Sequence, residues 1–148
     1  MESLLKGHLH DIGEVFLFHG TKADLKDVIA HSGFDERVAN LAGLFGAGVY
    51  FAENSSKSDE YCTPDKTGSC FMFLCRVMLG TPFLAEQPMR QLRRPPNLPG
   101  SNPSQLCDCV IGVTAATHPG AFLQRYREFV VYDRRQAYPE LLIEYKRI

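Results

Sequence analysis

Residues 45–61, FGAGVYFAENSSKSDEY, gather two tyrosines and a serine beside a backbone that carries few side chains. The glycines at 46 and 48 permit a tight turn and a close approach that a Cβ atom would block. Tyr50 lies in a short aromatic run, and the spacing of Ser58 and Tyr61 places a hydroxyl and a ring on one face of a helix. Such a set forms either a slot for a flat polar ring or an ordinary turn, and the sequence around it must decide.

His19 and Gly20 form a second set, at the end of the apolar run VFLFH. An imidazole can hydrogen-bond a ligand, and the bare backbone of glycine offers one donor and one acceptor, which together match a carboxamide. The alternative interpretation is that His19 is a hydrogen-bonded core residue.

Glu128 opens the apolar run EFVVY. Strand alternation places its carboxylate on the same face as the residues at 130 and 132. At a cleft, this group could bind a sugar hydroxyl or stabilise positive charge that develops on a ribose carbon. The alternative is that Glu128 is only the exposed end of a strand.

Short strands and early helices must position these residues. The run at 15–19 predicts a buried strand, and Thr21 with Asp24 resembles a capping box for a helix with apolar residues at 25, 28 and 29. Gly33 is expected to end that helix, and Asn54 or Ser55 to cap the one that follows. Further apolar runs predict strands at 49–51, 70–79, 110–113, 128–132 and 141–145. Strands dominate, which favours an α+β fold over a parallel βαβ sheet.

Length and composition bound the class of protein. The 148 residues, with 45% apolar and 22% charged side chains, fit one globular domain. No apolar run is long enough to span a membrane, and the first residues lack the apolar core of a secretion signal. Five cysteines without a framework spacing favour reduced thiols, so we expect an intracellular protein, cytoplasmic and/or nuclear.

Charge is unevenly distributed along the chain. The net charge of −1 argues against strong nucleic-acid binding, but residues 76–148 carry 10 basic and 6 acidic side chains. This half either presents a basic face or has an ordinary solvated surface. The candidates for a basic face are Arg90, Arg93, Arg94, Arg125, Arg127, Arg134 and Arg135.

Two further features are weaker signals. Residues 81–108 hold six of the nine prolines, so this long connection is expected to be a functional lid or a disordered loop. Zinc binding by the cysteines at 62, 70, 107 and 109 is disfavoured because their spacing does not match common zinc patterns.

Several blocks together resemble the catalytic domain of poly(ADP-ribose) polymerases, and most closely the tankyrase subgroup. These blocks are FLFHGT at 16–21, FGAGVYFAENSSKSDEYC at 45–62, CRVMLG at 75–80, and EFVVYD with QAYPE within 128–140. The resemblance implies the ADP-ribosyltransferase fold: two small packed, mainly antiparallel sheets with an NAD cleft and a few flanking helices. It would place the catalytic domain at residues 15–148, after an N-terminal extension at 1–14.

The resemblance also implies a histidine–tyrosine–glutamate triad. His19 would hold the adenosine-side ribose of NAD, Tyr50 would line the nicotinamide-side ribose, and Glu128 would be the catalytic carboxylate. The Gly20 backbone and the Ser58 hydroxyl would hold the nicotinamide carboxamide. The stacking partner of the nicotinamide ring would be Tyr61.

The loop at 35–44 would be the donor loop that closes over NAD, with Thr21 and Arg37 as weaker contacts near the adenosine. Two departures from the family pattern stand out. The tankyrase zinc cluster shrinks here to CTPDKTGSC, so we expect no metal. Segment 86–127, on the acceptor side, matches the family poorly.

These features predict transfer of ADP-ribose from the co-substrate NAD to a protein acceptor, the enzyme itself included, with elongation to poly(ADP-ribose). Mono-ADP-ribosylation of a protein or of a nucleic-acid end is the main alternative. A non-catalytic NAD or ADP-ribose binding module and net hydrolysis of NAD also remain open.

Overall fold

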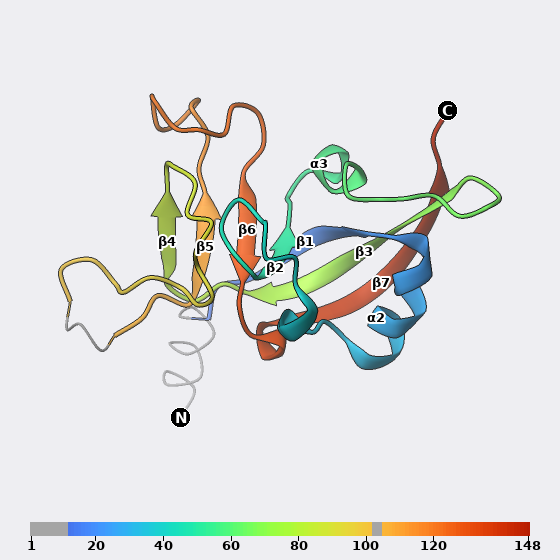
Figure 1. Cartoon of the computed structure of the whole chain (residues 1–148), viewed down its shortest axis with the longest axis horizontal. Coiled ribbons are helices and arrows are strands. Elements are labelled where there is room, and N and C mark those ends of the chain that lie inside the picture. Colours follow the sequence, from blue (N-terminus) through green and yellow to red (C-terminus); the bar gives the residue numbers. More distant parts are fainter. Residues whose placement is uncertain (1–11, 102–104) are drawn as a thin grey trace, which may run out of the picture.

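The computed structural model describes residues 12–101 and 105–148, which form two small sheets (Figure 1). The first sheet has the strand order β1-β3-β7 and the second the order β2-β6-β5-β4. All neighbouring strands are antiparallel except β4 and β5, which are parallel. The α+β class and the two mainly antiparallel sheets expected from the sequence are therefore confirmed. The strands are β1 (Glu14–Thr21), β2 (Val49–Phe51), β3 (Ser69–Met78), β4 (Pro82–Ala85), β5 (Cys109–Gly112), β6 (Glu128–Val131) and β7 (Ala137–Lys146).

In the first sheet the longest apolar run of the sequence forms the central strand, β3. Both flanking strands are edge strands, which corrects the expectation that residues 15–19 form a buried strand: Phe16 is 59% exposed. β1 also continues through Gly20 to Thr21 instead of ending at His19. Pro139 lies in the other edge strand, β7, where a residue without an N–H group is tolerated.

The second sheet contains one strand that sequence reasoning missed. β4 begins at Pro82, inside the proline-rich stretch, and pairs in parallel with β5. Proline is accepted at the first residue of a strand, so its presence obscured the short run that follows it. Beyond β4 and up to β5, the described residues form no helix or strand, although Asn97 and Leu106 make an isolated bridge.

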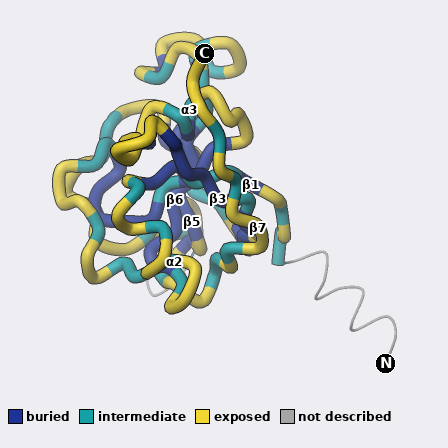
Figure 2. The backbone as a smooth tube through the Cα atoms, turned by 90° about the vertical axis from the view of Figure 1, so that its right-hand side faces the viewer, coloured by how far each residue is buried: buried dark blue, intermediate teal, exposed yellow. Residues whose placement is uncertain are grey.

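The main hydrophobic core lies between the two sheets. Leu17, Phe73 and Val77 of the first sheet belong to one buried cluster with Phe51 and Phe129 of the second. In Figure 2 the buried segments lie at the centre of the molecule, and the exposed segments lie around them. The exposed part includes connections, most of α2 and much of β7. The core fixes how the ends of β1, β2 and β6 face one another.

Two short helices flank the sheets, α2 (Lys26–Ser32) and α3 (Ser55–Asp59), on opposite sides of β1 and β3 in Figure 1. Three 3-10 turns accompany them: η1 (Ala23–Leu25), η2 (Glu36–Val38) and η3 (Arg134–Gln136). The expected capping box is not formed, because Thr21 is still in β1 and Lys22 precedes η1 without a side-chain cap. Gly33 ends α2 as expected, at a φ of 75°. Asn54 occupies the cap position of α3, but its side chain makes no capping bond.

Most of the predicted N-terminal extension, residues 1–14, lies outside the described residues, and Glu14 already belongs to β1. Within the described ranges, no helix is long and apolar enough to cross a membrane.

Candidate active site

A cavity of about 330 Å³ opens beside the ends of β1 and β2 and contains most of the predicted site residues. Its remaining walls come from α2 and from the loop at 33–44, which contains the predicted donor loop at 35–44. Much of its surface is apolar, which is typical of a site for a small molecule. The lining residues from the predicted site are His19, Gly20, Thr21, Tyr50 and Tyr61.

His19 is held in one tautomer by its backbone contact. Its Nδ1 lies 2.7 Å from the carbonyl oxygen of Tyr50, and a carbonyl can only accept, so Nδ1 carries the proton. Phe34 and Phe51 pack on the ring at centroid distances of 4.8 and 5.5 Å. Burial among these groups lowers the pKa of His19 to about 4. The neutral ring therefore keeps Nε2 as an acceptor for a ligand hydroxyl.

Gly20 leaves its backbone groups on an open strand edge. Phe18 exchanges both backbone bonds with Ala52, on the edge of β1 that faces away from β3. Backbone groups alternate between the two edges along a strand, so Gly20 points its N–H and C=O to the same side as Phe18. Among the described residues, no backbone partner pairs with Gly20 on that side. The edge can therefore form a donor–acceptor pair with a carboxamide.

Helix α3, which carries Ser58, packs directly against Gly20. A Cβ atom at position 20 would lie 1.8 Å from the Ser58 carbonyl oxygen, so only glycine allows this approach. Ser58 itself is buried at 2% exposure, and its hydroxyl donates to the carbonyl of Phe18 at 3.0 Å. Ser58 thus lies next to Gly20, as expected for a joint carboxamide site, but it does not line the cavity.

Tyr50 lines the cavity with its ring while its hydroxyl organises the glycine turn. The hydroxyl accepts from the N–H of Phe45 at 2.9 Å and donates to the carbonyl of Gly46 at 2.7 Å. Burial raises the pKa of Tyr50 to about 12, so the hydroxyl stays protonated. Gly43 packs against that hydroxyl, where a Cβ atom would approach it to 2.3 Å. The hydroxyl therefore joins the start of the glycine turn to the end of the predicted donor loop.

Glu128 is buried rather than exposed at its strand end, with 3% of its surface accessible. Its Oε1 accepts a hydrogen bond from the Tyr61 hydroxyl at 2.6 Å and lies 3.7 Å from the Lys57 ammonium. Burial and this bond raise the pKa of Tyr61. The carboxylate is thus tied to the ring expected to stack on nicotinamide, although Glu128 does not line the cavity.

Two weaker predictions, Thr21 and Arg37, have different positions. Thr21 is 5% exposed and lines the cavity next to Gly20. Arg37 does not line the cavity and instead donates to the Asp35 carboxylate from Nε and from one terminal guanidinium nitrogen, at 2.8 and 2.7 Å. This pairing lowers the pKa of Asp35 to about 2, and Asp35 rather than Arg37 lines the cavity.

Sequence reasoning missed several contributors. Phe34 and Phe51 enclose His19, and their remote positions give no periodic signal that could link them to it. Lys57 lies one residue before Ser58 in the motif that was singled out, but its closeness to Glu128 depends on the pairing of distant elements. The sequence indicated an apolar helix face at residues 25, 28 and 29 but not what it contacts, and Val28 is 60% exposed and lines the cavity.

The cysteines are all buried free thiols in this structure. Cys62 donates to the carbonyl of Phe71 at 3.1 Å and packs with Cys70 and Met72, whereas Cys109 belongs to the main core. Over residues 12–101 and 105–148, no group of three or more acidic, histidine or cysteine side chains is arranged to hold a metal ion.

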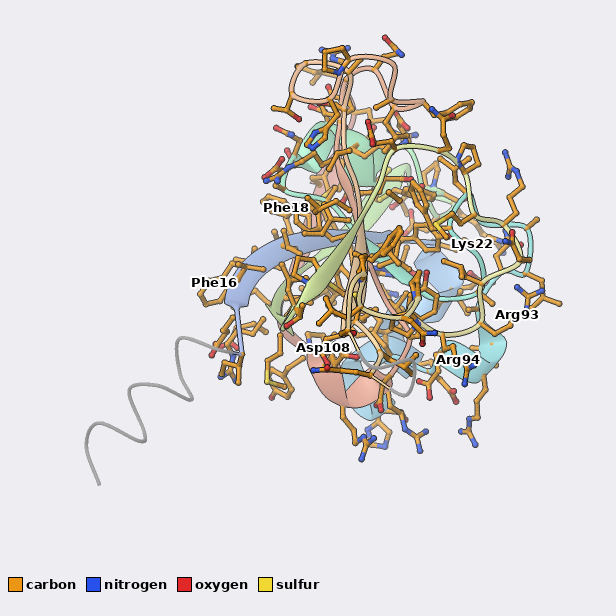
Figure 3. All side chains as sticks on the ribbon, turned by 90° about the vertical axis from the view of Figure 1, so that its left-hand side faces the viewer. Phe16, Phe18, Lys22, Arg93, Arg94 and Asp108 are labelled. Atoms are coloured by element: carbon orange, nitrogen blue, oxygen red, sulfur yellow. The ribbon has the colours of Figure 1, made fainter. Side chains whose placement is uncertain are left out.

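The arginines of the C-terminal half do not form one uniform basic face. Arg127 is paired with Glu53 at 2.7 Å, and Arg135 with Asp133 at 2.6 Å. Arg93 and Arg94 lie on the opposite side of the molecule from Phe16 in Figure 3. Part of the expected positive charge is therefore neutralised locally.

The chain is similar to known proteins over most of its length. The family model described as "Poly(ADP-ribose) polymerase catalytic domain" matches residues 4–147. Mouse protein mono-ADP-ribosyltransferase PARP12 is 36% identical over 91% of the chain, and human PARP11, which has the same description, is 31% identical over 90%. Human protein mono-ADP-ribosyltransferase PARP14 is 33% identical over 92% of the chain. The chain covers 17%, 42% and 7% of the lengths of these relatives.

The chain therefore belongs to the poly(ADP-ribose) polymerase catalytic domain family, a family of NAD-dependent ADP-ribosyltransferases. None of the three relatives is a tankyrase, so the finer resemblance to that subgroup rests on the sequence blocks alone.

Proposed function

We propose that this chain transfers a single ADP-ribose unit from NAD to a protein acceptor and releases nicotinamide. The observation that carries the proposal is the buried carboxylate of Glu128, whose Oε1 accepts a hydrogen bond from the hydroxyl of the cavity residue Tyr61. The mono-ADP-ribosyltransferase descriptions of the relatives give independent support.

In this proposal the cavity binds NAD in an extended form. The apolar wall formed by α2 and the loop at 33–44 takes the adenosine half, and Nε2 of His19 accepts a hydrogen bond from its ribose. The open edge of Gly20 pairs with the nicotinamide carboxamide, and the ring of Tyr61 stacks on the nicotinamide. Each of these contacts orients the bond that must break, which lowers the entropic part of the barrier.

Glu128 would act where charge develops. As the bond between the ribose C1′ and the nicotinamide nitrogen breaks, its electron pair leaves with nicotinamide, and a carboxylate stabilises the positive charge left on the ribose. A nucleophilic atom of the acceptor then bonds to C1′ and loses its proton to the surrounding water. Burial of Glu128 strengthens this effect, because charges interact more strongly away from water.

Single transfer is favoured over elongation by the same burial. Elongation requires a hydroxyl of a bound ADP-ribose chain to reach the catalytic carboxylate as the next nucleophile. Here Tyr61 occupies that carboxylate and Lys57 lies against it, so little of it faces a second chain. We therefore favour transfer of a single ADP-ribose unit over the poly(ADP-ribose) chain that the triad alone would lead one to expect.

Incubation with radiolabelled NAD tests the proposal. We expect label on protein as a single unit, and a loss of most transfer in Glu128→Gln with retained NAD binding. Glu140→Gln is the matched control, because Glu140 is an ion-paired carboxylate on β7 that does not line the cavity. A ladder of long products would refute mono-transfer. Free ADP-ribose as the only product, or binding without turnover, would point to hydrolysis or to a binding module.

The same assay distinguishes a nucleic-acid acceptor. Labelling of an oligonucleotide that weakens strongly as salt is raised would contradict a protein acceptor, because phosphate contacts release counterions on binding. Protein labelling that changes little with salt is the expected result.

A further inference from the structure

The helix that carries the nicotinamide side of the site cannot hold its own position. α3 is 5 residues long and has no side-chain cap at its N-terminus. Isolated helices of this length are unstable in water, because nucleation costs more than so few hydrogen bonds return. The placement of Tyr61, just after this helix, must therefore be fixed by contacts from elsewhere.

β1 and β3 supply two of these contacts, through the bonds from Ser58 to Phe18 and from Cys62 to Phe71. A larger set comes from residues at and just after the end of β7. Arg147 donates from Nε to both carboxylate oxygens of Asp59 at 3.1 Å, and from a terminal nitrogen to the carbonyls of Asp59 and Cys62, at 2.8 and 3.0 Å. The Tyr145 hydroxyl also donates to the Asp59 carboxylate. We call this set of contacts from Tyr145 and Arg147 the α3 clamp.

The clamp brackets Tyr61. Asp59 lies two residues before it and Cys62 directly after it, so Arg147 holds the carbonyls on either side of the ring-bearing residue. On its other side the ring is fixed by the bond from its hydroxyl to Glu128. Planar guanidinium groups hold such paired acceptors in a defined geometry, which a flexible ammonium does not.

The turn at 58–62, which runs from the end of α3 to Cys62, also packs against the predicted carboxamide site at Gly20. Ser58 packs against the backbone of Gly20, and Cys62 contributes its thiol to the same contact, at 2.9 Å from a Cβ atom built on Gly20. A shift of the turn would therefore change the stacking ring and the carboxamide edge together, while the adenosine wall on α2 and the 33–44 loop would stay in place.

We propose that Arg147 and Tyr145 are positioning residues for the nicotinamide half of the site: they act through the turn at 58–62 and touch no substrate. The inference rests on the proposed binding of NAD in this cavity. It predicts that loss of the clamp separates two affinities, lowering that for the nicotinamide half and sparing that for the ADP-ribose half.

Calorimetric binding of 3-aminobenzamide, a nicotinamide mimic, and of ADP-ribose to Arg147→Ala tests this. We expect benzamide affinity and kcat for transfer each to fall by about 10-fold or more, since displacement of about 1 Å can cost on the order of 100-fold. The affinity for ADP-ribose should stay within about 2-fold of the parent, because the walls that contact its adenosine part are not displaced and keep their geometry. Arg147→Lys should restore part of the loss, because an ammonium can still reach one carbonyl.

Arg76→Ala is the matched control. Arg76 is also ion-paired, lies in β3 of the sheet that ends next to Arg147, and has the same 46% side-chain exposure as Arg147. It contacts Glu140 and the ring of Tyr138 instead of α3. It should leave both affinities unchanged. If Arg147→Ala does not fold, Tyr145→Phe removes only one hydroxyl of the clamp and should give a smaller split in the same direction.

Unchanged benzamide binding in both clamp variants would overturn the inference, as would equal losses of both ligands. A parent protein that binds both ligands but transfers nothing would refute the proposed function alone. The role of the clamp would still be tested by comparing the affinities of the variants for 3-aminobenzamide and for ADP-ribose. A parent protein that binds neither ligand would refute both.

Discussion

Replacing Gly20 with alanine would force two elements of the site apart. The new methyl carbon would lie 1.8 Å from the Ser58 carbonyl oxygen, and real Cβ contacts essentially never fall below 3.0 Å. Because the obstacle is backbone, no rotamer change can relieve it, and the turn at 58–62 must move by more than 1 Å. Overpacking of this kind costs about 1–3 kcal/mol of folding stability.

Misplacement by about 1 Å can lower catalysis on the order of 100-fold. We therefore expect kcat/KM for NAD to fall by about that factor in Gly20→Ala, which corresponds to about 2.7 kcal/mol of lost transition-state stabilisation. The assay is initial-rate transfer from labelled NAD at several NAD concentrations, with urea unfolding of each variant measured in parallel.

Gly68→Ala is the control for stability. Gly68 has a φ of +84° and nothing within 4 Å of a built Cβ atom, so alanine there is strained but meets no neighbour. It should lose about 1–2 kcal/mol of stability through strain, with unchanged transfer kinetics. If Gly20→Ala transfers ADP-ribose as fast as Gly68→Ala, close packing of Ser58 on Gly20 is not needed for activity.

Two further predictions concern the other cavity residues. Tyr50→Phe leaves the N–H of Phe45 and the carbonyl of Gly46 without their partner, so unfolding free energy should fall by about 1–3 kcal/mol and NAD affinity should fall as well. Tyr132→Phe removes a comparable bond to the carbonyl of Phe45, away from the cavity, and should lower stability alone. An equal loss of NAD affinity in both variants would contradict this reasoning. For His19, whose pKa falls from 6.5 to about 4 on folding, the unfolded chain binds the proton first, so stability should decrease as pH falls from about 6.5 to 4. Urea titrations should show a flatter pH dependence in His19→Gln, and an unchanged slope would mean that the imidazole is not buried in its neutral form.

The sequence predicted the strands better than the contacts between them. Apolar runs located β3, β5, β6 and β7, and Gly33 marked the end of α2, because periodicity and glycine are local signals. β4 was missed because it begins with a proline, a residue that is rare in strands. The exposure of β1 was misjudged because its position at the edge of the sheet depends on which strands pair.

For the site, the sequence by itself determined which groups are available: a histidine before a glycine, a tyrosine in a short strand, and a carboxylate at the start of another strand. Only the tertiary structure decided that Glu128 is covered by Tyr61, that Arg37 binds Asp35 instead of facing the cavity, and that Lys57 lies near the carboxylate. The kinds of side chain present can be read from the sequence directly. How far each site side chain is buried, and which residues it contacts, depends on the pairing of strands far apart in the chain. For this reason the motif FGAGVYFAENSSKSDEY could predict a nicotinamide pocket, but not the contacts that Tyr145 and Arg147, at and just after the end of β7, make with the residues on either side of its second tyrosine.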